Sequence, residues 1–380
     1  MINANTLFDA YLDVNLLLAF VCGLWFVSGR LLDFVGFSYA ATARLRMLRA
    51  VFLAVLVSPV FVALFALLGR SGYVTTDHSV NLTDFIVAQY LQGRFDMSPS
   101  ALENMVSLRS RFAEALVSPV GQGVQWTLAA GIATCLVRLG WSVLKLRRVI
   151  AESYVWRRFG RVELRVSDTA SVPFSTRGLR SRIVVLPSTM LARGDDLRIA
   201  LGHELQHLRQ GDVEWEFVTG LIRPFLFWNP AFYIWKHQVE ELRELSCDRQ
   251  VLSRRGYDVA AYCNCLLRVC HDGLRPRRLL AVEAPIVALV RTENRFFGSR
   301  SATLLKRRMM SVIEGRAERH PTLAFAVLAA PALVVTLLAS VAIQRPGDWS
   351  PDRIMLSTIV NLERIHAVNG TTASFGQPGY

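Results

Sequence analysis

The sequence predicts an α-helical membrane protein with four transmembrane helices and an inserted α+β domain. Apolar residues make up 52% of the chain, more than is typical of a soluble globular protein. Four apolar stretches are each long enough to cross a bilayer, which takes about 20 residues. A long basic segment between the last two stretches carries both strand and helix patterns, and this segment is the predicted domain.

The four apolar stretches divide the chain into regions. The first three are expected to form transmembrane helices near 11–29, 50–68 and 123–144, with an outer loop at 70–121. The predicted regions are then a membrane region at 1–150, an inserted domain at 151–320, a fourth transmembrane helix at 321–344 and a short extracytoplasmic tail at 345–380.

Lysine and arginine are unevenly distributed along the chain. Residues 145–320 contain 31 of them against 19 acidic residues, whereas residues 1–10 contain none and the tail contains three. Because basic segments stay on the cytoplasmic side, we expect a multi-pass protein of the inner (cytoplasmic) membrane with its inserted domain in the cytoplasm. The net charge of +13 then reflects this bias and attraction to the anionic lipid bilayer. No recognition motif indicates direct binding of nucleic acid.

Local patterns predict several elements of the inserted domain. Short β-branched stretches at 161–168 and 181–187 predict strands. The stretch GDDLRIALGHELQHLRQ predicts a helix with Asp195 or Asp196 as its N-cap. The apolar segment 221–235 is interrupted by two prolines, so we expect it to lie at the membrane surface or to insert partly. Residues 237–255 predict the next helix.

Two histidines four residues apart lie inside the first predicted helix. Such residues lie one above the other, so His203 and His207 present two imidazoles to one point. Zinc accepts imidazole nitrogen and keeps a position open in catalytic sites. Glu204 is turned by about 100° from His203, where it can reach a water beside the ion. The pattern predicts zinc-dependent hydrolysis with Glu204 as general base. The alternative is a surface helix without metal.

A zinc hydrolase needs a third protein ligand. The following predicted helix offers four acidic candidates: Glu240, Glu241, Glu244 and Asp248. Glu244 and Asp248 are four residues apart and share a helix face. One of the two can bind the ion while the other holds a ligand imidazole by its far nitrogen. For each acid taken singly, the alternative is a solvated helix face.

Taken together, GHELQHLRQGD, WNP and ELSCD resemble the BlaR/MecR family of membrane-anchored zinc peptidases. The upstream PFSTRGLRSRIVVLP is similar to the strand and loop that lead to the HExxH helix in that family. The resemblance covers the four-span layout and most of 155–308, and it implies a gluzincin-like inserted domain. It implies these roles: His203, His207 and Glu244 as zinc ligands, Glu204 as base and Asp248 as a supporting acid.

The antibiotic-sensing members of that family carry a penicillin-binding sensor domain after the last span. About 37 residues follow position 343 here, which is too few for such a domain. The one S-x-x-K match, Ser142 to Lys145, lies at the edge of the third span and has no K-T-G after it. β-Lactam sensing is therefore not expected, and the input signal stays open.

The predicted function is that of a zinc endopeptidase in the membrane that takes part in signal transduction. Its substrate is expected to be a cytoplasmic protein, such as a transcriptional repressor, or the chain itself. A substrate peptide is expected to pair with an exposed strand at 182–186. The alternative is a receptor or scaffold that keeps the zinc fold and signals by binding a partner. A channel or transporter is disfavoured because paired broken spans are lacking. Homo-oligomerisation stays open.

The residue that stabilises the oxyanion is not determined by the sequence. Its candidates are Arg243, Arg249, Tyr257 and Arg295. The cysteines of CNCLLRVCH and Cys247 are expected to be free and to pack as small apolar side chains.

Overall fold

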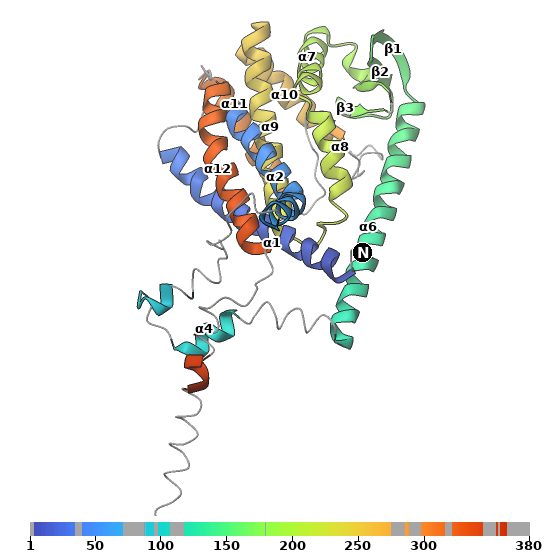
Figure 1. Cartoon of the computed structure of the whole chain (residues 1–380). Helices are drawn as coiled ribbons and strands as arrows, with labels where there is room; N and C mark the ends of the chain where they lie inside the picture. Colours follow the sequence, from blue (N-terminus) through green and yellow to red (C-terminus); the bar gives the residue numbers. More distant parts are fainter. Residues whose placement is uncertain are drawn as a thin grey trace, which may run out of the picture. The chain divides into compact units, whose positions relative to one another are not determined.

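The protein is mostly helical with one small sheet, as a computed structural model shows (Figure 1). The structure describes residues 4–34, 40–70, 87, 89–94, 98–106, 118–178, 180–274, 286–288, 298–315, 321–344, 355 and 358–362. Most of the predicted outer loop and of the predicted tail lies outside these residues. The described parts form two compact units, one made of residues 1–21, 50–128 and 330–380 and the other of residues 22–49 and 129–329.

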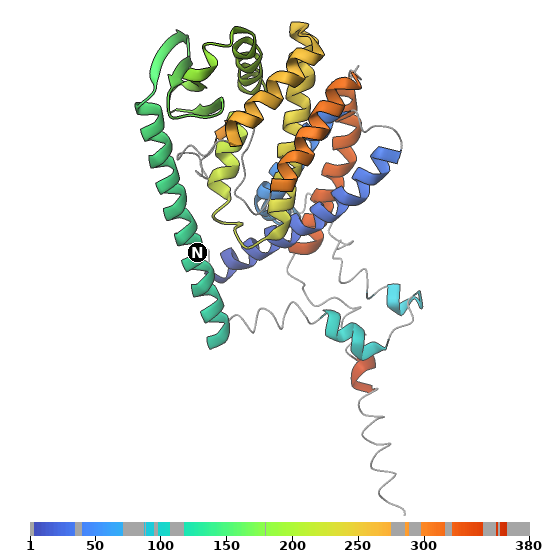
Figure 2. The ribbon, with the colours of Figure 1, turned by 180° about the vertical axis from the view of Figure 1, so that it is seen from behind.

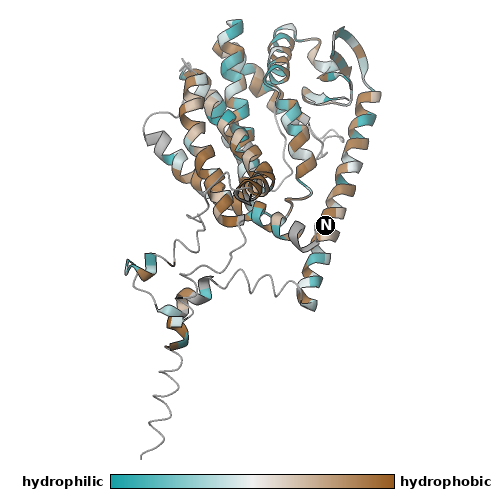
Figure 3. Ribbon diagram, viewed as in Figure 1, coloured by the Kyte–Doolittle hydropathy of each residue, from teal (hydrophilic) through white to brown (hydrophobic). Residues whose placement is uncertain are grey.

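Four described helices are long and apolar enough to cross a membrane, in agreement with the four predicted spans. They are α1 (Ala4–Phe34), α2 (Ala41–Arg70), α6 (Pro119–Ala151) and α12 (Pro321–Gln344). Hydrophobic residues cover most of α12 in Figure 3. A short helix, α4 (Pro99–Val106), lies in the predicted outer loop.

The candidate span in α2 covers Ala41–Phe65 and begins earlier than predicted. It therefore includes arginines, which are costly in a membrane unless they face protein. Arg44 donates a hydrogen bond to the carbonyl of Gly29, and Arg49 pairs with Asp212. These partners explain why a helix can continue through residues that a hydropathy pattern excludes.

A five-stranded mixed sheet follows α6 in the chain. Its strands are β1 (Tyr154–Phe159), β2 (Val162–Ser167), β3 (Phe174–Arg177), β4 (Arg182–Pro187) and β5 (Ile286–Ala288), in the order β1-β2-β4-β3-β5. The sheet includes both strands that the sequence predicts, as β2 and β4. The described strands β1 and β5 form its two edges.

The prediction that a peptide pairs with an exposed strand at 182–186 is wrong. β4 pairs with β2 in parallel and with β3 in antiparallel register, so neither of its edges is free. All but the first of its residues are buried. An apolar strand without polar alternation is typical of the sheet centre, and the sequence pattern alone does not distinguish it from an edge.

The helices after the sheet supply the site and its supports. They are α7 (Gly194–Gln210), α8 (Asp212–Ile222), α9 (Pro230–Arg255), α10 (Val259–Leu274) and α11 (Gly298–Ile313). α7 packs against α9, and α11 packs against α9 and α10, which is visible from behind in Figure 2. A core of buried side chains that includes Cys247, Cys263 and Cys265 joins these helices.

One local prediction needs correction. The N-cap of α7 is Arg193, without a side-chain cap bond, and Asp195 and Asp196 lie in the first helical turn, where acids favour the helix dipole. The segment 221–235 is interrupted, as its prolines indicate, and its position at the membrane surface stays a prediction. It contains the end of α8, a turn and the start of α9, where the Asn229 side chain accepts a hydrogen bond from the backbone N–H of Ala231.

Candidate metal centre and active site

His203 and His207 meet on the buried face of α7. Their Nε2 atoms lie 3.0 Å apart, and both side chains are fully buried. The four-residue spacing on one helix causes this approach, as the sequence predicts. The two rings lie edge to face, with their centroids 4.6 Å apart.

The far nitrogen of each imidazole has an acceptor. His207 Nδ1 lies 2.6 Å from Asp212 Oδ2. His203 Nδ1 lies 2.9 Å from the hydroxyl oxygen of Tyr262, whose O–H donates to Asp248 Oδ1 over 2.7 Å. If both Nδ1 atoms donate, both Nε2 atoms carry a lone pair. Two lone pairs 3.0 Å apart repel unless a cation lies between them, so the arrangement suits a metal ion.

Glu244 on α9 faces the same point. Its Oε2 lies 3.5 Å from His203 Nε2 and 3.8 Å from His207 Nε2. Tetrahedral zinc with bonds of 2.0–2.2 Å separates neighbouring ligand atoms by about 3.3 Å. Glu244 Oε2 is buried without a hydrogen-bond partner, whereas Oε1 accepts a bond from Arg243 Nε. The two imidazoles and this carboxylate are a donor set that fits zinc.

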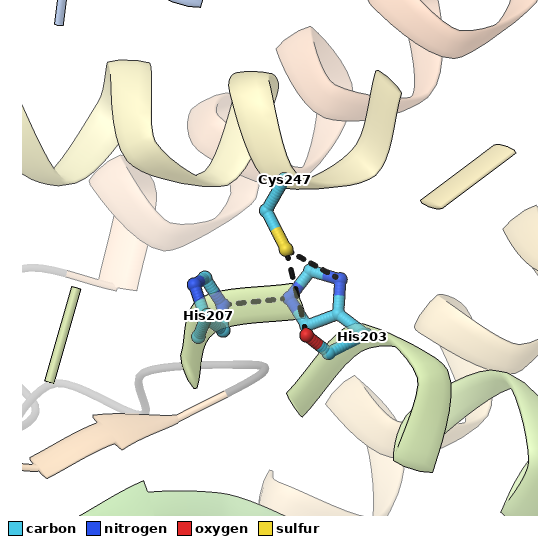
Figure 4. Close-up of side chains that lie close together, drawn as sticks. All are labelled: His203, His207 and Cys247. Carbon is cyan, nitrogen blue, oxygen red and sulfur yellow. Dashed lines mark hydrogen bonds between the residues drawn. The ribbon is translucent and has the colours of Figure 1, made fainter. Parts of the chain in front are cut away.

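Cys247 is a further donor close to the imidazoles. With His203 and His207 it forms a group whose ligand atoms lie within 4.8 Å of one another and could hold a metal. In Figure 4 its sulfur points from α9 toward the His203 ring. The sulfur lies 3.6 Å from Nδ1 of that ring and donates to the carbonyl oxygen of His203. The sulfur also acts on His207, because Cys247 is among the neighbours that raise the pKa of that imidazole.

Glu204 occupies a dry position beside the histidines. It is fully buried, and its Oε2 accepts a hydrogen bond from the hydroxyl of Ser175 on β3. Its Oε1 is buried without a hydrogen-bond partner. Burial raises the pKa of Glu204, against the opposing effect of His207 and His203. A carboxylate with one fixed oxygen and one unoccupied oxygen is suited to take up a proton.

Asp248 holds the second ligand-bearing helix to α11. Arg308 donates to both of its carboxylate oxygens, from Nε to Oδ2 and from Nη2 to Oδ1, each over 2.7 Å. Arg308 Nη1 also lies 3.4 Å from Glu244 Oε2. Burial opposes ionisation of Asp248, but Arg308 holds its pKa below the usual range. The structure therefore brings Asp248 to the far nitrogen of His203, at 3.3 Å, and not to the paired Nε2 atoms.

The surroundings of the imidazoles stabilise positive charge. Burial alone would lower the pKa of His207, but Cys247 and Glu244 together with other neighbours raise it to about 10. Burial alone would raise the pKa of Glu244, but His207 and the other cations nearby hold this pKa well below its usual range. A site that favours a proton on buried imidazoles also favours a metal cation.

The remaining acidic candidates lie elsewhere. Glu240 pairs with Lys236, and Glu241 pairs with Arg307. Among the oxyanion candidates, Arg243 is bound to Glu216 and Glu244, and the Tyr257 hydroxyl donates to the carbonyl of Arg198. Arg249 donates to Ser311, and Arg295 lies outside the described residues. None of these contacts identifies the group that stabilises an oxyanion.

Sequence reasoning missed four supporting residues: Ser175, Asp212, Tyr262 and Arg308. Asp212 had a local signal, because Gly211 ends α7 with a φ of 71° and the next side chain can turn back onto the last helical turn. Ser175, Tyr262 and Arg308 come from distant elements, and no local sequence signal points to them.

A cavity of about 560 Å³ lies at the end of the sheet and includes no site residue. It is lined by Arg161, Arg177, Gly178, Arg180, Ser181, Arg182 and Glu214.

Residues 144–295 match the family model described as BlaR1 peptidase M56. The match confirms the resemblance to the BlaR/MecR family, and the matched segment contains α7, α8 and α9 with both histidines. No curated protein matches the chain. The matched segment is thus similar to a family of metallopeptidases, and the four apolar helices agree with a membrane-associated protein of that kind.

Proposed function

We propose, from the match of residues 144–295 to the BlaR1 peptidase family model, that the protein is a zinc endopeptidase in the inner membrane. The observation that carries the proposal is the convergence of His203 Nε2, His207 Nε2 and Glu244 Oε2 within 3.8 Å. Zinc bound there would polarise a peptide carbonyl and acidify a bound water. Its ligands would be these two histidines and Glu244.

Glu204 is the proposed general base. It follows His203 on α7, so its side chain lies beside the histidine pair and not between the two imidazoles. Ser175 fixes one carboxylate oxygen, and the other has no hydrogen-bond partner. A purely structural metal site has no need of a buried, desolvated carboxylate in this place. This position therefore favours an enzyme over a receptor that only binds a partner.

The chain itself is a proposed substrate, besides a cytoplasmic protein such as a transcriptional repressor. β3 is the strand that contacts Glu204 through Ser175. β5 pairs antiparallel with β3, and Val287 lies opposite Ser175 in the register. Peptides commonly bind enzymes and other proteins by adding a strand to a sheet edge. The chain's own β5 thus occupies the edge that an external peptide would need, which supports cleavage near β5 or its displacement by a substrate.

Comparison of cells that produce wild type or Glu204→Gln tests this function. We expect new protein N-termini in wild-type cells that are lacking with Glu204→Gln, among cytoplasmic proteins or in the chain near β5. Glu240→Gln, which removes a carboxylate outside the site, is the control and should behave as wild type. Identical N-termini for wild type and Glu204→Gln, with zinc bound to both, would instead support the receptor or scaffold.

A further inference from the structure

A buried ion pair joins the candidate membrane span α2 to the histidine pair. Arg49 Nη2 donates to Asp212 Oδ1 over 2.5 Å, and Asp212 Oδ2 lies 2.6 Å from His207 Nδ1. Arg49 is 8% exposed and Asp212 is fully buried. The Asp212 carboxylate therefore contacts both Arg49 on α2 and the His207 imidazole, whose Nε2 faces His203.

Arg49 is held in place on more than one side. Its Nη1 donates to the carbonyl of Gln210, the last residue of α7, and its guanidinium lies over the Trp215 ring at 5.5 Å. The planar fork of arginine makes such a set of contacts directional. The position of Asp212 is thus determined from the α2 side as well as from the α7 side.

A second contact from the same face of α2 reaches the other ligand-bearing helix. Thr42 and Arg49 are seven residues apart and lie on one helix face. The Thr42 hydroxyl lies 3.0 Å from the hydroxyl of Ser246, which is two residues after Glu244 on α9. One face of α2 therefore contacts the supports of both the histidine pair and Glu244.

We propose that Arg49 is a positioning residue of the metal centre, which orients His207 through Asp212 and makes metal binding depend on the placement of α2. This inference rests on the proposed metal site. Partners that orient a ligand imidazole typically contribute a factor of about 10–100 to metal affinity. A displacement of the first turns of α2 would loosen Asp212 and so weaken the site, which gives a transmembrane helix a direct means of control.

The test uses the full-length protein in detergent and measures Zn²⁺ affinity by competition and the d–d spectrum of the Co²⁺ form. Arg49→Met should weaken Zn²⁺ binding by about 10–100-fold and alter the spectrum. Arg49→Lys should restore part of the affinity. Arg46→Met, at an exposed position one turn earlier, is the control and should match wild type.

The double variant Arg49→Met/Asp212→Asn removes both charges of the buried pair. It replaces Arg49→Met in the test if the single variant does not fold. It should bind Zn²⁺ no more weakly than Asp212→Asn alone, because both residues act through one contact. Wild-type affinity and spectrum in folded Arg49→Met, or additive losses in the double variant, would overturn the inference. Failure of the wild type to bind Zn²⁺ would instead refute the proposed function.

Discussion

The hydroxyl of Ser175 on β3 donates a hydrogen bond to Glu204 Oε2 on α7. This contact links β3, which pairs with the edge strand β5, to the proposed base Glu204. Ser175 and Glu204 are both fully buried, so the carboxylate has no competing solvent. The pairing explains how a carboxylate can keep one orientation while its second oxygen has no hydrogen-bond partner.

Ser175→Ala should lower kcat and leave the Zn²⁺ content unchanged. A hydrogen bond to a charged group contributes about 1.5–3 kcal/mol, so a loss of roughly tenfold or more in turnover is expected. The measurement is turnover of a validated substrate, with zinc determined on the same samples. Unchanged turnover would show that the Ser175 contact has no part in catalysis.

Glu204→Gln should keep zinc and lose proteolysis. Helical geometry turns Glu204 by about 100° from His203, so it is not a proposed ligand, and an amide cannot accept the proton. Removal of a general base typically costs about 10²–10⁴-fold in rate. Metal analysis and cleavage assays on the purified variant check this. Near wild-type cleavage by Glu204→Gln would assign the base to another residue.

Glu244→Ala and Asp248→Ala should differ in kind. Glu244→Ala removes a proposed ligand and should strip most of the zinc. Asp248→Ala removes the acceptor behind Tyr262 and should weaken zinc or activity by about 10–100-fold. Zinc titration of both variants, with Glu240→Gln as control, decides between the roles. Full wild-type Zn²⁺ affinity in Glu244→Ala would show that the third zinc ligand is a residue other than Glu244.

Cys247→Ser tests the competing donor. Because Glu244 Oε2 already lies within 3.8 Å of both paired Nε2 atoms and supplies the third ligand, we expect Zn²⁺ affinity to stay close to that of wild type. The Co²⁺ form of the wild type should then lack an intense thiolate-to-metal charge-transfer band. Such a band, lost in Cys247→Ser, would identify the thiolate as a ligand.

The peptidase segment should lie in the cytoplasm. The excess of lysine and arginine in 145–320 indicates this orientation. Single cysteines introduced at positions 85 and 370 should react with an impermeant thiol reagent in intact cells, and one at the exposed position Ala192 should react only after the cells are permeabilised. The unmodified protein gives the background of its native cysteines. Labelling of the cysteine at position 192 in intact cells would contradict the predicted topology.

Features that depend on near neighbours in the chain were determined by the sequence. Length and hydropathy alone predicted the four long apolar helices, and the structure has them. A spacing of four residues placed His203 and His207 on one helix face, because the helical repeat depends only on local backbone geometry. The motifs around them also sufficed for the family resemblance.

Contacts between distant segments were decided only by the tertiary structure. Ser175 is 29 residues from Glu204, Tyr262 is 59 from His203 and Arg308 is 60 from Asp248. Arg49 lies 163 residues from Asp212. The same holds for β4, whose apolar pattern fits an interior or an edge strand until β2 and β3 pair with it. Such partners follow from the packing of whole elements, for which one sequence carries no local periodic signal.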